Sequence, residues 1–332
     1  MQTFKTLTLM VTMATATFGC TQDTNTESSP FVRPSLELKD IDGHQNDSSG
    51  SDEGDSIDHE NIERSPTSAN DDNTSTDNDA LCNGTFISAE AVDEMIDLTT
   101  TTDSETIYTT YKRIDQIAAL FEDCSDPWGM FPTTYRHITR RIIQAIERGE
   151  IDDDAWGRRI VLDFAGRYLA NLRLALLGGK PSFAWEQYYY LADRNDVSRT
   201  RAVVVAMVAH LTLDLPYSLV AVDSTDDHKE DYFVLGELMI EITPDFIEDL
   251  KVFYDTDAED FLTGFFVGDW VDGAFGADTT ITFSYQTIRT KSWNNRWYLE
   301  QWWGRVIAEG EIYTAFWSID GVLATLDAAG TI

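Results

Sequence analysis

The sequence predicts an all-α fold: a single multi-helix domain over residues 81–332, preceded by about 80 residues of different character. From about residue 88 onward, apolar side chains recur at steps of three and four residues, which places them on one face of a helix. No alternating apolar and polar run is long enough for a sheet. The 17 Phe, 13 Tyr and 9 Trp residues lie nearly all beyond residue 80, so this region can bury a sizeable core.

Residues 1–19 have the features of a lipoprotein signal peptide. One lysine stands near the start, and an uncharged apolar stretch from Leu7 to Phe18 leads to a glycine and then to Cys20. The stretch is shorter than the roughly 20 apolar residues of a membrane-spanning helix. We expect cleavage before Cys20 and lipidation of that cysteine, with palmitate among its acyl chains, although Thr17 stands where such signals usually carry Leu. An ordinary secretory signal cut nearby is the alternative.

A lipid on Cys20 would place the protein in the bacterial cell envelope, facing the periplasm or the cell surface, with the membrane as its partner. Residues 20–80 are rich in Asp, Ser, Thr, Asn and Gly, and their few apolar residues are scattered singly. Such a segment cannot bury enough surface to offset the entropy of ordering, so it predicts a disordered acidic linker. Sixty flexible residues typically span about 45 Å.

The three cysteines fit an exported protein. Lipidation of Cys20 leaves Cys82 and Cys124 as an even pair in a compartment that permits disulfides. We expect these two to be bonded, whereas two buried free thiols are the alternative. The bond would close a loop of about 40 residues and, in the entropic model, stabilise the domain by roughly 3–4 kcal/mol.

Periodicity and helix-ending residues divide the domain into successive helices. The first is predicted over about 104–122, where Ser104 gives a capping signal and Pro127 follows the end. Pro216 is expected to end or kink a strongly apolar helix that begins near Val197. Residues 273–283 are expected to form a loop with room for a short strand at 279–283. The other predicted helices cover about 130–148, 153–177, 183–192, 230–254, 258–272, 285–308 and 311–327.

The charge balance argues against nucleic-acid binding. The chain has a formal net charge of −34, and residues 21–80 alone hold 16 acidic against 3 basic side chains. Phosphate recognition needs a basic stripe, but the only basic cluster, between Arg136 and Arg148, belongs to one short helix of an acidic domain. We therefore expect no nucleic-acid partner, and we attribute the surplus acid to solubility.

The most specific candidate site is the pair His210 and Asp214 on the apolar helix. Residues four apart share a helix face, so both side chains can reach one point. They could ligate a metal, or Asp214 could orient His210 as a general base. A structural histidine bonded to its helix neighbour is the simpler alternative. Asp163 is expected to join the pair as a third polar group, although Arg167, four residues later, offers it a partner of its own.

No known catalytic signature accompanies these residues. The sequence contains no G-x-S-x-G, P-loop, G-x-G-x-x-G, H-E-x-x-H or C-x-x-C motif. The run H-x-x-x-D before a proline loosely resembles one motif of helical zinc phospholipases and nucleases, which surround their metals with several histidines. This chain can supply at most one divalent metal, held by His210, Asp214 and Asp163.

Three blocks resemble the bacterial helical family of unknown function DUF5995. They are FPTTYRHITRRI at 131–142, LDFAGRYLANL at 162–172 with the following Trp185, and MVAHLTLDLPYSLV at 207–220. The resemblance covers about residues 110–255, and it implies a helical fold and a pocket position without a reaction. His210, Asp214 and Leu215 match one family motif, and Asp163, Phe164 and Tyr168 match another; Asp231 and Tyr232 resemble a later pair.

Two positions depart from the family pattern, because Val208 and Gly236 stand where asparagines are expected. Two polar partners of the site are therefore missing. The first functional hypothesis is a lipid-anchored extracytoplasmic domain that binds a ligand or partner without catalysis. The alternative is a metal-dependent hydrolase that uses His210 and Asp214.

Overall fold

The computed structural model describes residues 81–267 and 285–332, and this part of the chain is all-α, as the periodicity predicts. Its sheet content is one two-residue antiparallel pairing between β1 (Cys82–Asn83) and β2 (Phe86–Ile87). The signal peptide, Cys20, the acidic linker and the strand suggested at 279–283 lie outside the described residues.

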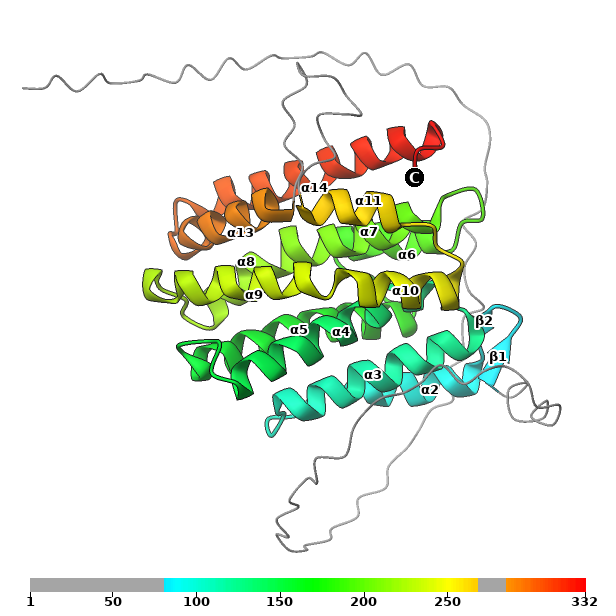
Figure 1. Cartoon of the computed structure of the whole chain (residues 1–332), viewed down its shortest axis with the longest axis horizontal. Helices are drawn as coiled ribbons and strands as arrows, with labels where there is room; N and C mark the ends of the chain where they lie inside the picture. Colours follow the sequence, from blue (N-terminus) through cyan, green and yellow to red (C-terminus); the bar gives the residue numbers. More distant parts are fainter. Residues whose placement is uncertain (1–80, 268–284) are drawn as a thin grey trace, which may run out of the picture. The chain divides into compact units, whose positions relative to one another are not determined.

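The helices follow one another through short connections (Figure 1). Their bounds are α2 (Ala89–Leu98), α3 (Ile107–Cys124), α4 (Met130–Glu147), α5 (Asp154–Leu176), α6 (Phe183–Ala192), α7 (Arg199–Ala209), α8 (Leu215–Ala221), α9 (Lys229–Glu241), α10 (Thr243–Tyr254), α11 (Glu259–Val267), α13 (Tyr285–Glu300) and α14 (Arg305–Ala328).

Three expected boundaries are wrong for local reasons. Helix α3 begins after Thr106, whose side chain accepts a hydrogen bond from the Thr109 backbone, so the cap is not Ser104. The helix expected over 230–254 is two helices, because Pro244 starts a new helix within the first turn of α10. The helix expected over 285–308 ends at Glu300, and α14 follows after a short turn.

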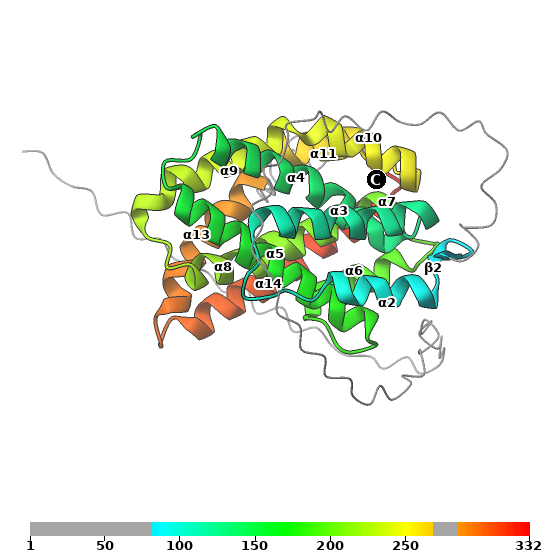
Figure 2. The same ribbon diagram turned by 90° about the horizontal axis from the view of Figure 1, so that it is seen from below.

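Helix α7 lies at the centre of the domain. It packs against α4, α6 and α14, while α3 packs on α4, α4 on α10 and α13 on both α8 and α14 (Figures 1 and 2). Every residue of α7 from Ala202 to Ala209 is buried. This explains the weak amphipathic pattern of the segment, because a helix surrounded by other helices has no solvent face.

Helices α7 and α8 form one continuous run, Arg199–Ala221, joined by a π-helical turn at His210–Asp214. By length and composition alone this run could cross a membrane, with a mean hydropathy of 1.7. However, 83% of its most apolar window is buried inside the domain, which is typical of a core helix.

The start of the domain is held to α3 by the expected disulfide. Cys82 and Cys124 are bonded, with their Cα atoms 5.4 Å apart. Asp126, just after α3, reinforces this attachment, because its carboxylate accepts hydrogen bonds from the backbone N–H groups of Ile87 and Trp128. The β1–β2 hairpin is therefore fixed to the end of α3 by a covalent bond that polar contacts reinforce.

Candidate functional site

The π-helical turn at His210–Asp214 is a consequence of Pro216. A proline inside an α-helix lacks the N–H donor, and its ring clashes with the carbonyl four residues back, here that of Thr212. In this turn the Leu215 N–H donates to the His210 carbonyl, five residues back, which widens the helix. The helix consequently continues to Ala221. Of the two outcomes expected from the sequence, an end or a kink at Pro216, the helix end is therefore not observed.

His210 and Asp214 share one helix face, as the spacing predicts. His210 Nδ1 lies 2.9 Å from Asp214 Oδ2, and the indole Nε1–H of Trp185 on α6 donates to the same oxygen at 2.8 Å. Both members of the pair are about 95% buried or more. Because a carboxylate can only accept hydrogen bonds, Nδ1 carries the histidine proton and Nε2 carries the lone pair.

Four aromatic rings enclose the His210 imidazole. Phe164 stacks on it with ring centroids 3.4 Å apart and planes 10° from parallel. Phe131, Tyr135 and Trp185 present T-shaped contacts at centroid distances of 5.2, 4.9 and 5.8 Å. Nε2 has no hydrogen-bond partner among the described residues. Burial lowers the pKa of His210, so the ring is neutral at pH 7.

Asp163 does not join this pair. Its carboxylate bonds Arg167 Nε at 2.6 Å, and the same nitrogen donates to Ser218 Oγ at 2.9 Å. The side chain lines an open groove of about 360 Å³ with Glu105 and Arg159, and this groove shares no lining residue with the cavity described below. The second possibility weighed from the sequence, pairing of Asp163 with Arg167, is therefore the one observed.

The three-ligand metal site that the alternative hypothesis required is not assembled among the described residues. In residues 81–267 and 285–332, no group of three or more His, Cys, Asp or Glu side chains is placed to hold a metal ion. His137, the other histidine on a long helix, bonds Asp249 through Nε2 at 2.6 Å and links α4 to α10. What the His210 pair retains is an oriented, neutral imidazole in an aromatic enclosure.

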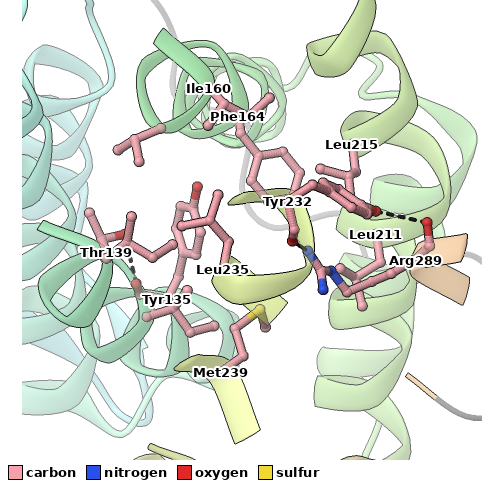
Figure 3. Close-up of a pocket in the computed structure, with 13 residues that line it drawn as sticks. Tyr135, Thr139, Ile160, Phe164, Leu211, Leu215, Tyr232, Leu235, Met239 and Arg289 are labelled. Carbon is pink, nitrogen blue, oxygen red and sulfur yellow. Dashed lines mark hydrogen bonds between the residues drawn. The ribbon is translucent and has the colours of Figure 1, made fainter. Parts of the chain in front are cut away.

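A cavity of about 50 Å³ adjoins the aromatic enclosure, and Tyr135 and Phe164 belong to the walls of both (Figure 3). Its lining comes from α4, α5, the α7–α8 run, α9 and α13. All but a few of the lining side chains are apolar; the full set is Tyr135, Ile138, Thr139, Ile142, Ile160, Val161, Phe164, Leu211, Leu215, Tyr232, Leu235, Met239 and Arg289.

Among the described residues of that lining, Arg289 is the one charged side chain, and sequence reasoning missed it. It is 3% exposed, and its guanidinium lies over the Tyr232 ring at 4.1 Å from the centroid. The two residues bond twice, because Arg289 Nη2 donates to the Tyr232 carbonyl and the Tyr232 hydroxyl donates to the Arg289 carbonyl at 2.8 Å (Figure 3). Burial raises the pKa of Tyr232, which keeps that hydroxyl protonated.

Gly236 makes room for this arginine. A Cβ at position 236 would lie 1.4 Å from Arg289 Nη1, far inside any permitted contact. The only sequence signal of this arrangement was a glycine in the middle of an apolar helix, at a position where the family resemblance suggested an asparagine.

A second buried charged cluster lies on the other side of α4. Arg136 bonds Glu122 of α3 at 2.8 Å and Asp249 of α10 at 2.6 Å. Burial raises the pKa of Glu122. Burial opposes the shift of Asp249, but hydrogen bonds from His137 and Arg136 outweigh it and lower the pKa of that carboxyl. These charges pair with one another, so the cluster holds three helices together and is not a candidate binding site.

Comparison with known proteins places the site within a family. The model of a family of unknown function, DUF5995, matches residues 107–309, which is more than half of the chain. The match extends beyond the three blocks noted in the sequence and takes in α13 with Arg289. No curated protein and no solved structure matches the chain.

Proposed function

The chain belongs to DUF5995, a family of unknown function, and we propose from the site that its helical domain binds a small, mainly apolar ligand without catalysis. The observation that carries this proposal is the cavity beside the His210 enclosure. Binding sites for small molecules are concave, mostly apolar and furnished with a few convergent polar groups. The cavity has an apolar lining and one buried cation, which fits that description.

Binding is favoured over hydrolysis by the placement of the polar side chains. A metal-dependent hydrolase needs several ligands around one point, and Asp163 is committed to Arg167 instead. A general base must reach the proton that it removes, but four rings surround His210, which does not line the cavity. His210 and Asp214 then serve to fix the aromatic wall of the binding site.

We also propose that the domain works outside the cytoplasm, anchored by a lipid on Cys20 and held off the membrane by the acidic linker. The disulfide between Cys82 and Cys124 supports a compartment that permits disulfide bonds. The apolar stretch before Cys20 supports export. In this arrangement the ligand of the cavity would be a small molecule from the cell envelope or its surroundings.

Met239 supplies a direct test of ligand binding, because its thioether lines the cavity. The purified full chain, labelled at its methionine methyl groups, is titrated with the neutral probe propionamide and followed by NMR. The Met239 methyl resonance, assigned with Met239→Leu, should move in a saturable way. Val161→Phe should abolish the shift, because the added ring fills the cavity from α5.

The matched control is Val252→Phe, on an α10 position that is 61% exposed and away from the cavity. This variant should keep the full shift. If Val161 tolerates no phenylalanine, Ile142→Phe fills the cavity from a less buried position. A Met239 shift that survives filling of the cavity would reject the binding proposal.

A further inference from the structure

Arg289 is a buried cation without an acidic partner. The other buried arginine of the described chain, Arg296 on the same helix, bonds Asp226 at 3.0 Å, and the partly buried Arg201 bonds Asp320 at 2.9 Å. Arg289 forms no ion pair within the described residues, and its Nη1 has no hydrogen-bond partner there although it is buried. An isolated buried charge is strongly unfavourable unless something neutralises it.

The contacts that Arg289 does make hold it in place without neutralising it. Its guanidinium lies over the Tyr232 ring and within 5.5 Å of the Tyr285 centroid, and Nη2 is bonded to a backbone carbonyl. These contacts orient the planar group, and Arg289 forms part of the cavity wall (Figure 3). A guanidinium with free N–H donors matches a carboxylate better than any other common group.

The other lining residues restrict the kind of molecule to which the bound carboxylate can belong. The neighbouring walls are formed by Ile138, Ile142, Leu235 and Met239, which favour an alkyl chain. None of the described residues that line the cavity is acidic, so the ammonium group of an amino acid would find no counter-charge among them. The cavity volume of about 50 Å³ limits the ligand to a small molecule.

We propose that this cavity binds a short-chain aliphatic monocarboxylate whose carboxylate accepts a hydrogen bond from the Arg289 guanidinium. This inference rests on the proposed function and specifies its ligand class. The alkyl chain lies against the apolar walls from α4 and α9, and the carboxylate neutralises the guanidinium. Gly236 is part of the proposed binding site, because any larger side chain at this position would displace the guanidinium that binds the anion.

The decisive comparison uses two probes of almost equal shape on the unaltered full chain: propionate and its neutral isostere, propionamide. Their dissociation constants are measured from the Met239 methyl resonance. Propionate should bind at least tenfold more tightly, because only it can pair with Arg289. Arg289→Gln should abolish this preference.

The control variant is Arg296→Gln, which removes another buried arginine from α13, one that lies outside the cavity and is already paired. It should preserve the preference for propionate. Equal affinity of the unaltered chain for both probes would overturn the carboxylate inference and leave the binding proposal standing. Failure of both probes to bind would overturn both the carboxylate inference and the binding proposal. Because the probe comparison needs no variant, it decides the question even if Arg289→Gln does not fold.

Discussion

The guanidinium of Arg289 occupies the space in which a side chain at position 236 would begin: a Cβ on Gly236 would lie 1.4 Å from Nη1. Helix α13 therefore packs against α9 by placing a charged side chain over a glycine. The glycine and the arginine act as one unit, although 53 positions separate them in the sequence.

Gly236→Ala tests that relationship. The added methyl must push the guanidinium off the Tyr232 ring and break its bond to the Tyr232 carbonyl, so the free energy of unfolding should fall by about 2 kcal/mol. Gly166→Ala on α5 is the matched control, because its Cβ would meet nothing within 4 Å. Removing that glycine should stabilise the helix by up to about 1 kcal/mol. Urea denaturation of both variants measures the difference, and equal effects would contradict the close contact.

The buried pair of His210 and Asp214 predicts that replacing Asp214 destabilises the domain much more than replacing Asp163. Asp214→Ala leaves the donors of His210 and Trp185 unpaired in the core, so the free energy of unfolding should fall by about 3 kcal/mol. Asp163→Ala removes a partly exposed ion pair with Arg167 and should change the free energy of unfolding by less than about 1 kcal/mol. Denaturant titration of the two variants gives the comparison. A larger loss for Asp163→Ala would show that the site is centred elsewhere.

Much of the fold and half of the candidate site could be predicted from the sequence. His210 and Asp214 were identifiable because two polar residues four apart interrupt an apolar helix, where they must satisfy each other. Asp163 was wrongly joined to them because spacing within a helix cannot say whether a carboxylate turns toward a neighbouring helix or toward Arg167 on its own. Arg289 was not identifiable, because α13 is a polar helix and only its packing over Gly236 buries that side chain.

Protonation of His210 should make stability depend on pH. Burial lowers its pKa in the folded state, whereas the unfolded chain has the ordinary value of about 6.5. Below pH 6.5 the unfolded state therefore binds more protons, so the stability that is present above this pH is lost as the pH falls toward the folded-state pKa. Between pH 7 and pH 5 the unaltered chain should lose up to about 2 kcal/mol more than His210→Gln does.

His228→Gln is the control for that measurement, since His228 is a half-buried histidine near the surface, stacked on Trp156. The loss of stability at low pH that His210→Gln removes should persist in this variant. Equal pH profiles for the unaltered chain and His210→Gln would mean that the buried imidazole does not control stability in this range.

The disulfide predicts a loss of stability on reduction. Cys82→Ser with Cys124→Ser opens a loop whose ends are 42 positions apart, which should lower the free energy of unfolding by roughly 3–4 kcal/mol in the entropic model. The unreduced, unfolded protein should also resist alkylation at both residues. Labelling of both thiols without a reductant would show that the disulfide is absent. The proposed compartment would then lose one of its supporting observations.

The lipid anchor is tested at Cys20. Mass spectrometry of the mature protein should find a diacylglyceryl group on this cysteine and no residue before it. Cys20→Ser should release the protein from membranes while the helical domain stays folded. A variant that remains as firmly bound to membranes as the parent would reject the anchor.

The bond between Cys82 and Cys124 also determines how the domain bears a mechanical load. A pull on the chain before residue 81 enters the domain at Cys82 and passes through the sulfur atoms to the end of α3. Strand β2 and helices α2 and α3 lie within the loop that the bond closes, so they carry no tension. The force that the domain withstands is therefore set by the chain after Cys124, beginning with the packing of α4 on α10, rather than by the small hairpin that the pull reaches first.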